Sequence, residues 1–226
     1  MARSVIVTGG FGVLGQAVAQ AFAAKGDKVA RIDFAPAAQV ALAGALDIGG
    51  VDLTNADATA AALGRVVEVH GGIDVLINVA GGFTWETLEG GSLASWAKMQ
   101  AMNLTTAATI TQLALPYLKN SQAGRIVNIG AGAAIKAGMG MGAYAASKSG
   151  VHRLTEALAE ELAGSSVTVN AILPSIIDTP TNRADMPDAD FSQWVQPQAI
   201  ADVIAFLASD AARAVTGALV PVTRGG

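Results

Sequence analysis

The sequence predicts an α/β fold in which one doubly wound domain is built on a mostly parallel, seven-stranded sheet. Three observations lead to this fold class. Short runs rich in Val and Ile alternate along the chain with longer segments rich in Ala and Leu. The short runs are apolar throughout, which is typical of parallel strands buried on both faces. A glycine-rich loop joins the first run to the first helical segment, as in Rossmann-type sheets built from right-handed β-α-β units.

Each element can be placed by its pattern. Strands are expected at 4–8, 28–33, 73–78, 124–130, 167–173 and 218–223, with a weaker seventh strand at 48–53. Helices are expected at 13–24, 56–69, 92–118, 142–163 and 198–208. The sequence contains no linker, repeat or low-complexity tract, and its 226 residues suit a single domain, so we expect one domain over 1–226.

Segment 174–197 is the most irregular part of the chain. It contains four prolines with polar residues between them. It also follows a predicted strand at its carboxyl end, which is where open α/β sheets bind their ligands. We therefore expect this segment to form a lid over a substrate.

The composition excludes several classes of protein. The net charge is −4 and no stretch concentrates Lys and Arg, so we expect no nucleic-acid partner. No apolar run reaches the roughly 18–20 residues of a membrane span, and the N-terminus has no signal-peptide pattern, so we expect no membrane association and a cytoplasmic location. The chain has no cysteine, which rules out disulfides and fits a reducing compartment. Its two histidines are too few and too scattered for a metal site.

The loop in SVIVTGGFGVLG (residues 4–15) predicts a nucleotide site. It places Gly9, Gly12 and Gly15 between the first strand and the first helix. Glycine lets the loop turn sharply and lets its backbone approach a pyrophosphate. The helix N-terminus offers free N–H groups and the positive end of its dipole. A plain strand–helix turn is the alternative interpretation.

Asp33 favours NAD(H) over NADP(H). It ends the second predicted strand, 18 residues after Gly15, close to the spacing at which an acid binds the adenosine ribose. A carboxylate there repels a 2′-phosphate. Arg31 lies two residues earlier, inside the strand, and is poorly placed to bind that phosphate. The alternative is that Asp33 only caps a loop.

Tyr144 and Lys148 are the candidate catalytic pair. They lie four residues apart in a predicted helix, so they share one helix face. A free tyrosine with a pKa of about 10 exchanges protons poorly at neutral pH. A neighbouring ammonium favours the phenolate and draws that pKa toward the working range. Taken alone, the pattern is explained better by a packed tyrosine beside a solvated lysine.

These segments, with four others, resemble the short-chain dehydrogenase/reductase family over essentially the whole chain. The matching segments are TGGFGVLG (8–15), VDL (51–53), NVAG (78–81), MNL (102–104), YAASK (144–148) and LPSIIDTP (173–180). The resemblance implies an NAD(P)-dependent oxidoreductase in which Tyr144, Lys148 and Asn103 are catalytic. It also implies a cofactor site made of Gly9, Phe11, Gly12, Leu14, Gly15, Asp33, Phe34, Asp52, Leu53, Asn78, Ala80, Gly81, Tyr144, Lys148, Pro174, Ile177 and Thr179.

The sequence departs from the family pattern in two places. Its glycine loop reads TGxxGxxG rather than the common TGxxxGxG, and Ala131 stands thirteen residues before Tyr144, where family members usually have a catalytic serine. The dihydropteridine reductases within the family are similar to this chain in both respects. Their segment after the sixth strand is also close to DTPTNRADMPDADFSQW (178–194). However, Phe83 stands where that group is expected to have tryptophan, and Asn103 is not expected there.

Ala131 determines the predicted substrate. A serine at this position donates a hydrogen bond to the oxygen on which negative charge develops, and losing one such donor typically costs on the order of 10²–10³ in rate. A conjugated C=N or quinonoid ring needs that donor less, because its charge is delocalised over atoms that a tyrosine and water can protonate. We therefore predict an NADH-dependent reductase of a planar, quinonoid dihydropterin-like substrate, with Ala131, Phe83 and Trp85 lining the substrate site.

Two alternatives remain open. One is a ketone or alcohol oxidoreductase in which Thr84, Thr181 or Asn182 replaces the missing donor. The other is a non-catalytic redox sensor that binds the dinucleotide and reports it to a partner, although such proteins tend to lose the Tyr/Lys pair. The resemblance also implies a homodimer or homotetramer, because the family usually pairs its two long helices across a two-fold axis.

Overall fold

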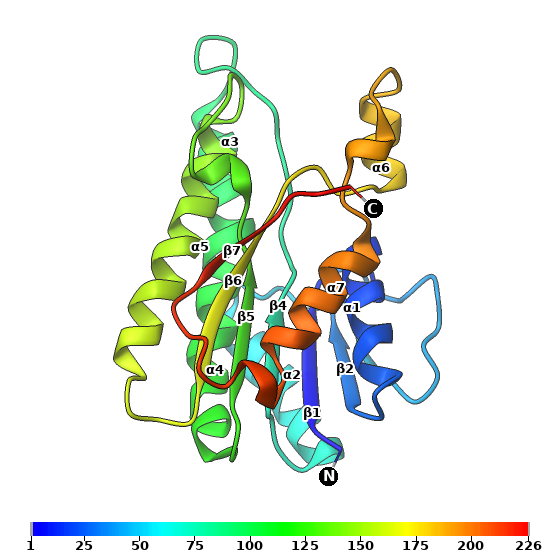
Figure 1. Ribbon diagram of the computed structural model, residues 1–226, viewed down its shortest axis with the longest axis vertical. Helices are drawn as coiled ribbons and strands as arrows, with labels where there is room; N and C mark the ends of the chain where they lie inside the picture. Colours follow the sequence, from blue (N-terminus) through cyan, green and yellow to red (C-terminus); the bar gives the residue numbers. More distant parts are fainter. Residues whose placement is uncertain (1, 226) are drawn as a thin grey trace.

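Seven parallel strands form the centre of the fold in the order β3-β2-β1-β4-β5-β6-β7. The computed structural model describes residues 2–225, and Figure 1 shows the sheet between two layers of helices. The strands are β1 (Ser4–Thr8), β2 (Lys28–Ile32), β3 (Leu46–Ile48), β4 (Val75–Asn78), β5 (Arg125–Ile129), β6 (Thr168–Pro174) and β7 (Leu219–Val222). Every neighbouring pair is parallel, so the predicted doubly wound sheet is confirmed.

The helices bury their apolar faces on the two sides of this sheet. Helices α1 (Val13–Ala23) and α7 (Pro197–Leu207) cover one side, and α2 (Ala56–His70), α4 (Thr106–Asn120) and α5 (Gly142–Glu161) cover the other. Successive strand residues alternate between the sides. In β1, Ile6 packs with the second group of helices, whereas Val5 and Val7 pack with the first. Full burial of each such side chain stabilises the fold by roughly 1.5–3 kcal/mol.

The long helix predicted at 92–118 is confirmed as an unbroken helical stretch over 93–120, but it contains a π-helical segment that the sequence did not predict. Helix α3 (Leu93–Met99) runs into a π-helical segment, Gln100–Thr105, and α4 follows it. A π turn inserts an extra residue into the helix and often marks a functional position. Here it contains Asn103, whose side chain is directed into the interior and is only 1% exposed.

The weak strand predicted at 48–53 is displaced toward the N-terminus. Strand β3 pairs with Ala30–Ile32 of β2 and ends at Ile48. The residues that follow form a loop, in which the Val51 N–H donates to the Asp33 carbonyl at 3.0 Å. The position of this edge strand is fixed by pairing with β2 rather than by an apolar run of its own.

Two projections rise from the edge of the sheet at which the strands end (Figure 1). One comprises α3 and the loops beside it. The other comprises α6 (Pro180–Asp185), which lies within the 174–197 segment together with a 3-10 turn at Phe191–Gln193. A bridge between Ile177 and Val195 joins the two ends of that segment. Within residues 2–225, no helix has the length and hydropathy required to cross a membrane.

Candidate active site

The loop between β1 and α1 is shaped by its glycines. Gly9 has φ +60°, a left-handed conformation, and a Cβ on it would lie 2.9 Å from the Cα of Ala80. A Cβ on Gly15 would collide with the backbone of Gly9. Gly12 is the N-cap of α1 and no side chain caps this helix, so its first N–H groups face outward. A pyrophosphate fits this shape and polarity, and the residues present therefore fit a dinucleotide.

Asp33 fixes the glycine loop to the end of β2. Its two carboxylate oxygens accept the N–H groups of Phe11 and Ala35, each at 2.9 Å. An ionised carboxylate has about four acceptor positions, so Asp33 can still accept hydrogen bonds from ribose hydroxyls. Phe34 follows it and is exposed. The structure therefore brings Asp33 to the glycine loop, as the spacing in the sequence predicts.

Arg31 is held in an ion pair. Its guanidinium donates to both carboxylate oxygens of Asp47, at 2.7 and 2.6 Å, and to the carbonyl of Val40 at 3.2 Å. The arginine side chain is 1% exposed and lies 5.4 Å from the centre of the Phe11 ring. This geometry agrees with the inference that Arg31 is poorly placed to bind a 2′-phosphate.

Residues 51–53 lie beside Asp33, as expected for the wall of an adenine site. Asp52 accepts hydrogen bonds from the hydroxyl and the N–H of Thr54, which together hold the pKa of its carboxyl below the ordinary value. Leu53 is buried in the core, as is Leu14 of the glycine loop. Contact of these residues with the cofactor remains a prediction.

The loop after β4 passes close to both the glycine loop and the catalytic pair. The hydroxyl of Thr8 accepts the N–H of Ala80 at 3.0 Å. A Cβ on Gly81 would lie 2.6 Å from Oδ1 of Asn103 and 3.3 Å from Nζ of Lys148. Glycine at this position therefore leaves room for the two side chains. The structure brings Ala80, Gly81, Asn103 and Lys148 together from three separate segments of the chain.

Asn78 is buried in a polar chain beneath this loop. Its Nδ2 donates to Thr111 at 2.9 Å and to Asn128 at 2.8 Å, and Asn128 in turn donates to Thr155 at 2.9 Å. These bonds link β4 and β5 to α4 and α5. The side chain of Asn78 thus holds the sheet to its helices, and its predicted contact with the cofactor remains a prediction.

Asn103 joins the π-helical segment to the loop after β4 and to α5. Its Oδ1 accepts the N–H of Gly82 at 2.9 Å, and its Nδ2 donates to the Gly82 carbonyl at 3.1 Å and to the hydroxyl of Ser147 at 2.9 Å. The Ser147 hydroxyl donates to the carbonyl of Tyr144 at 2.7 Å. Asn103 is therefore linked directly to the turn of α5 that carries Tyr144.

Tyr144 and Lys148 lie in the first turns of α5, and both are largely buried. Burial raises the pKa of Tyr144 to about 12 and lowers the pKa of Lys148 to about 8. Nζ of Lys148 donates to the carbonyl of Ile129 at 2.7 Å. The ring of Phe83 meets that of Tyr144 edge to face, with centroids 4.9 Å apart. At pH 7 the tyrosine is therefore a neutral phenol. The expectation that Lys148 draws the pKa of Tyr144 toward the working range is not met, because burial dominates that pKa and Nζ of Lys148 is directed to the Ile129 carbonyl.

Ala131 offers the site no hydrogen-bond donor. Its buried side chain is a methyl group, and its N–H donates to Nε2 of His152 at 3.3 Å. The preceding residue, Gly130, leaves room for the imidazole, because a Cβ there would lie 2.5 Å from the same nitrogen. His152 was not predicted as a site residue from the sequence. Its signal is the spacing of Tyr144, Lys148 and His152 at four-residue intervals on one helix face.

Asp178 braces the segment that follows β6. Its carboxylate accepts hydrogen bonds from Nε and Nη2 of Arg183, at 2.6 and 2.7 Å, and from the amide of Gln196 at 2.8 Å. The bonds from Arg183, and then from Gln196, lower the pKa of Asp178 to about 2. The guanidinium of Arg183 also lies over the ring of Phe191, 4.7 Å from its centre.

The residues predicted to hold the nicotinamide carboxamide lie at the base of this segment. Pro174 ends β6, and the Thr179 hydroxyl caps α6 by accepting the N–H of Asn182 at 3.1 Å. The amide of Asn182 donates to the Ile177 carbonyl at 2.7 Å. Asn182 is therefore already bound within the segment, which weakens it as a replacement for the missing serine.

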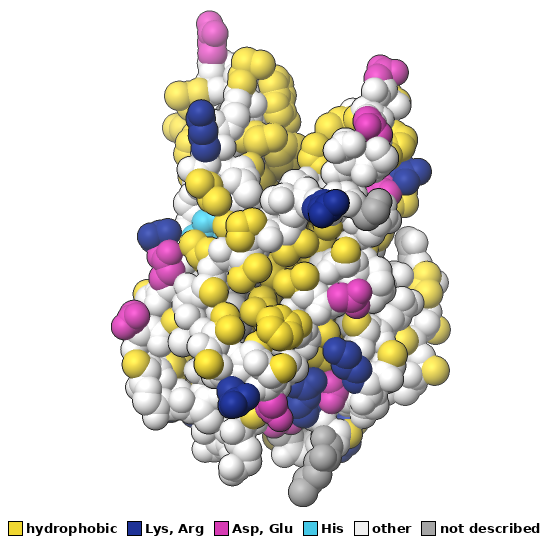
Figure 2. All heavy atoms as spheres, viewed as in Figure 1, with side chains coloured by type: hydrophobic (Ala, Val, Ile, Leu, Met, Phe, Trp, Pro, Cys, Tyr) yellow, Lys and Arg dark blue, Asp and Glu magenta, His cyan; other side chains and the backbone are white. Residues whose placement is uncertain are grey.

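Apolar side chains border the hollow between the two projections (Figure 2). The exposed large hydrophobic residues of the segments concerned are Phe83, Trp85, Leu88, Ile135, Met139, Ile176 and Met186. Segments 83–92, 133–141 and 175–193 together contain two basic residues, Lys136 and Arg183, and Arg183 is paired as described above. The same segments contain six acidic residues, so these walls combine apolar side chains with a negative charge balance.

Trp85 packs on the loop before α5. Gly140 has φ +74°, and a Cβ there would overlap the indole of Trp85. The N–H of Glu86 donates to the Gly140 carbonyl at 2.8 Å. The loop after β4 is thus docked on the loop that leads to Tyr144: Phe83 contacts Tyr144 itself, and Trp85 packs on Gly140, four residues before that tyrosine.

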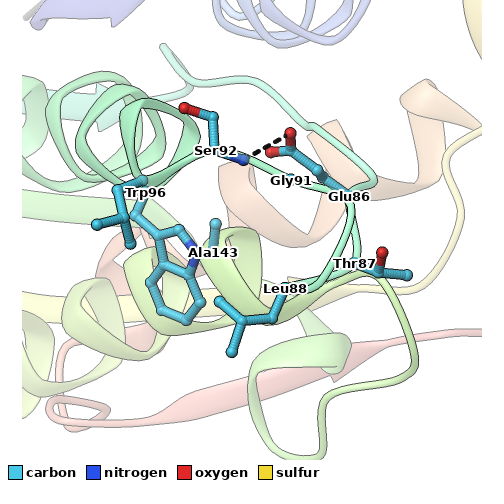
Figure 3. Close-up of a pocket in the computed structure, with 8 residues that line it drawn as sticks. Glu86, Thr87, Leu88, Gly91, Ser92, Trp96 and Ala143 are labelled. Atoms are coloured by element: carbon cyan, nitrogen blue, oxygen red, sulfur yellow. Dashed lines mark hydrogen bonds between the residues drawn. The ribbon is translucent and has the colours of Figure 1, made fainter.

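A small pocket lies on the other side of this loop. Figure 3 shows it between residues 86–93, Trp96 of α3 and Ala143 at the start of α5. The Ser92 N–H donates to the Glu86 carboxylate at 2.9 Å and closes the loop around it. Tyr144 does not line this pocket, which is therefore separate from the catalytic pair. In the described part of the chain, no three His, Cys, Asp or Glu side chains are grouped so as to hold a metal ion.

Comparison with known sequences agrees with this geometry. The family model described as short chain dehydrogenase matches residues 3–190. The chain is 30% identical to the 3-oxoacyl-(acyl-carrier-protein) reductase FabG of Thermotoga maritima, with 97% of this chain and 96% of that protein covered. It is 33% identical to the acetoacetyl-CoA reductase of Allochromatium vinosum, with 100% and 98% covered.

Solved structures show the same architecture. The ligand-free aldohexose dehydrogenase of Thermoplasma acidophilum superposes with a TM-score of 0.89 at 30% identity, covering 98% of this chain and 92% of that one. An NAD⁺-bound xylitol dehydrogenase gives a TM-score of 0.88 at 25% identity, covering 99% and 98%. The chain therefore belongs to the short-chain dehydrogenase family of NAD(P)-dependent oxidoreductases.

Proposed function

We propose that this protein is an NADH-dependent reductase of a planar, conjugated, quinonoid dihydropterin-like substrate. The observation that carries this proposal is the state of Ala131. Its side chain has no hydroxyl, and its N–H is already bound to His152. Residue 131 therefore supplies neither a side-chain nor a backbone donor to a developing oxyanion, which disfavours a simple ketone.

The residues that would hold the dinucleotide are those of the glycine loop, Asp33, and the base of the 174–197 segment. The outward N–H groups of α1 would bind the pyrophosphate, and Asp33 would accept from the ribose hydroxyls. When bound, the dinucleotide supplies a hydride. Asp33 and the ion-paired Arg31 support a preference for NADH, since a 2′-phosphate would meet a carboxylate and no available guanidinium.

Tyr144 supplies the proton. Its high pKa keeps the phenol protonated at neutral pH, so the hydroxyl can donate to a ring nitrogen or oxygen of the substrate as the ring takes up the hydride. The phenolate that remains is stabilised by the ammonium of Lys148. Lys148, one helical turn away, then returns a proton to the tyrosine and is itself reprotonated from solvent, for which Asn103 supports a water path by family resemblance.

The surroundings of the pair support a flat, uncharged substrate. Phe83 contacts Tyr144 and Trp85 packs on the loop that leads to it, and aromatic groups favour stacked or edge-to-face contacts with flat rings. The 174–197 segment, which we propose as the substrate lid, adds a second apolar wall. Resemblance to the dihydropteridine reductases in the 178–194 segment supports the same substrate class.

A ketone or alcohol oxidoreductase is the second candidate. The observation that favours it is the set of relatives, which includes an acetoacetyl-CoA reductase and a 3-oxoacyl-(acyl-carrier-protein) reductase. Such a reaction would need a donor in place of serine, and Thr84 and Thr181 are candidates. Segments 83–92, 133–141 and 175–193 contain more acidic than basic residues, which disfavours a phosphate-bearing acyl carrier. Cytoplasmic location and homo-oligomeric assembly stay predictions.

Steady-state turnover with NADH on a panel of quinonoid dihydropterins, quinones and ketones tests the proposal. We expect turnover of the pterins and quinones, and its loss in Tyr144→Phe. Robust ketone reduction with no pterin activity would favour the second candidate. Unchanged turnover in Tyr144→Phe would remove the catalytic role of the tyrosine, and NADH binding by that variant, followed by fluorescence, controls for loss of the cofactor.

A further inference from the structure

His152 is a buried titratable residue to which the mechanism above gives no role. It lies on α5, one turn beyond Lys148, and is 3% exposed. Residues spaced by four on a helix share one face. Tyr144, Lys148 and His152 therefore form one stripe of ionisable side chains, and the stripe faces the segment that leaves β5.

Two members of this stripe bind neighbouring points of the same backbone. Lys148 donates to the Ile129 carbonyl at 2.7 Å, and His152 accepts the Ala131 N–H at 3.3 Å. The helix thus presents a cation to the carbonyl of Ile129 and a lone pair to the N–H of Ala131, and so holds the 129–131 backbone at both of its ends. Gly130 lies between these contacts, and any side chain there would displace the imidazole.

The contact defines the protonation of the imidazole. A ring nitrogen that accepts an N–H cannot itself carry a proton, so a neutral His152 has its proton on Nδ1. Protonation of Nε2 would place its N–H opposite the N–H of Ala131. Two donors would then face each other without an acceptor, and the contact would break. Protonation would also place a second positive charge one turn from Lys148.

The charged groups that act on His152 all belong to α5. Burial is the main cause that lowers its pKa below the ordinary value, Arg153 and Lys148 lower it further, and Glu156 opposes them. The segments packed against the ring from β5 and β6 contribute Gly130, Ala131 and Leu173, none of which titrates. His152 is therefore neutral under the conditions in which the contact with Ala131 forms.

We propose that His152 is a positioning residue for hydride transfer: together with Lys148 it clamps the 129–131 backbone, and it keeps the N–H of Ala131 bound and away from the substrate. This inference rests on the proposed function of the site. It assigns to His152 the placement of the 129–131 backbone next to Tyr144. It also explains how the site tolerates alanine at 131, because the imidazole holds the backbone there from behind.

Two variants separate positioning from simple packing. His152→Gln retains a side-chain acceptor that does not titrate, and His152→Leu retains bulk without an acceptor. We expect His152→Leu to lower kcat about tenfold, the scale of one lost buried hydrogen bond, with little change in KM for NADH, and His152→Gln to recover most of that loss. As pH falls below the ordinary histidine range, wild-type kcat should fall because His152 becomes protonated, whereas His152→Gln should show no such fall.

The tautomer is measured without any substrate. The chain has two histidines, so in a His70→Gln background the ¹⁵N imidazole signals report His152 alone. We expect an Nδ1-protonated ring that titrates below the ordinary histidine range. Because this measurement is made on a protein that retains His152, it tests the proposal even if His152→Leu fails to fold. An Nε2-protonated ring, or equal kcat and equal pH profiles in wild type and both variants, would overturn the proposal. Reduction of ketones only would overturn the proposed function instead, and the His152 variants would then be compared on the ketone.

Discussion

The ring of Phe83 lies edge to face against the ring of Tyr144, with an interplanar angle of 81° and centroids 4.9 Å apart. This contact joins the loop after β4 to α5 and fixes the orientation of the phenol. It also contributes to the burial that raises the pKa of Tyr144 to about 12. A protonated tyrosine held beside an aromatic wall suits reduction of a flat substrate that takes its proton from that hydroxyl.

Replacing Ala131 by serine should restore the missing donor. We expect Ala131→Ser to raise kcat/KM for a ketone by about 10-fold to 10²-fold, somewhat less than the full effect of an optimised oxyanion donor. Turnover of a quinonoid dihydropterin should change much less, because its charge is already delocalised. Steady-state kinetics on both substrates checks this, with Ala133→Ser as the matched control. Equal changes on both substrates would show that Ala131 does not select between them.

Lys148 should make stability depend on pH in the alkaline range. Its folded pKa, about 8, lies below the ordinary lysine value of 10.5, so the unfolded state binds more protons between these values and the stability of wild type rises with pH across this window. In Lys148→Met this rise should be absent. The difference in unfolding free energy between the two proteins should therefore change by about 3 kcal/mol from pH 7 to above pH 10.

Denaturant unfolding at a series of pH values measures this difference. The exposed Lys136→Met is the control and should follow wild type throughout. A constant difference between Lys148→Met and wild type over the whole range would contradict the burial of Lys148 as the cause of its lowered pKa.

Asp33 should set the cofactor preference mainly by strengthening the binding of NADH, and only to a small extent by weakening that of NADPH. In Asp33→Asn the side chain keeps one acceptor oxygen but can no longer accept from both Phe11 and Ala35. We expect NADH affinity to fall about tenfold, as for the loss of a hydrogen bond to a charged group. NADPH should gain little, because Arg31 stays paired with Asp47. Fluorescence titration with both dinucleotides measures this, with the exposed Asp57→Asn as control, and equally tight binding of both by wild type would contradict it.

Asp178 should hold the 174–197 segment in place. Its pKa of about 2 lies below the ordinary aspartate value of 3.8, so its contribution to stability is fully present above pH 3.8 and is lost as pH falls through about 2. At neutral pH, Asp178→Asn should free Arg183 and speed tryptic cleavage after that residue. The exposed Asp188→Asn is the matched control. Identical cleavage rates in the two variants would show that the ion pair does not brace the segment.

The sheet could be predicted because its signal is local. Buried parallel strands such as Ser4–Thr8 and Val75–Asn78 are continuous apolar runs, and each is read from a few neighbouring residues. Strand β3 lacks such a run, since its position depends on pairing with β2. The π-helical segment was missed for a similar reason: the hydrogen bonds of Asn103 to Gly82 and Ser147 join segments distant in sequence.

The candidate site likewise has residues that the sequence predicts and side-chain partners that it does not predict. Gly9, Asp33, Tyr144 and Lys148 follow patterns of spacing, and the structure brings them to one edge of the sheet. The partner of a side chain does not follow from spacing. Nothing near His152 in the sequence indicates that it binds Ala131, and nothing near Arg31 indicates Asp47. Such pairs arise only when strands and helices are packed together.

Internal competition between two acceptors tests the central claim most directly. Wild-type enzyme with limiting NADH is given a quinonoid dihydropterin and a β-keto thioester in one solution, and the ratio of products gives the ratio of their kcat/KM values. The absence of a donor at residue 131 predicts that the dihydropterin is consumed first, by a factor of about 10². Preferential consumption of the β-keto thioester would contradict the account.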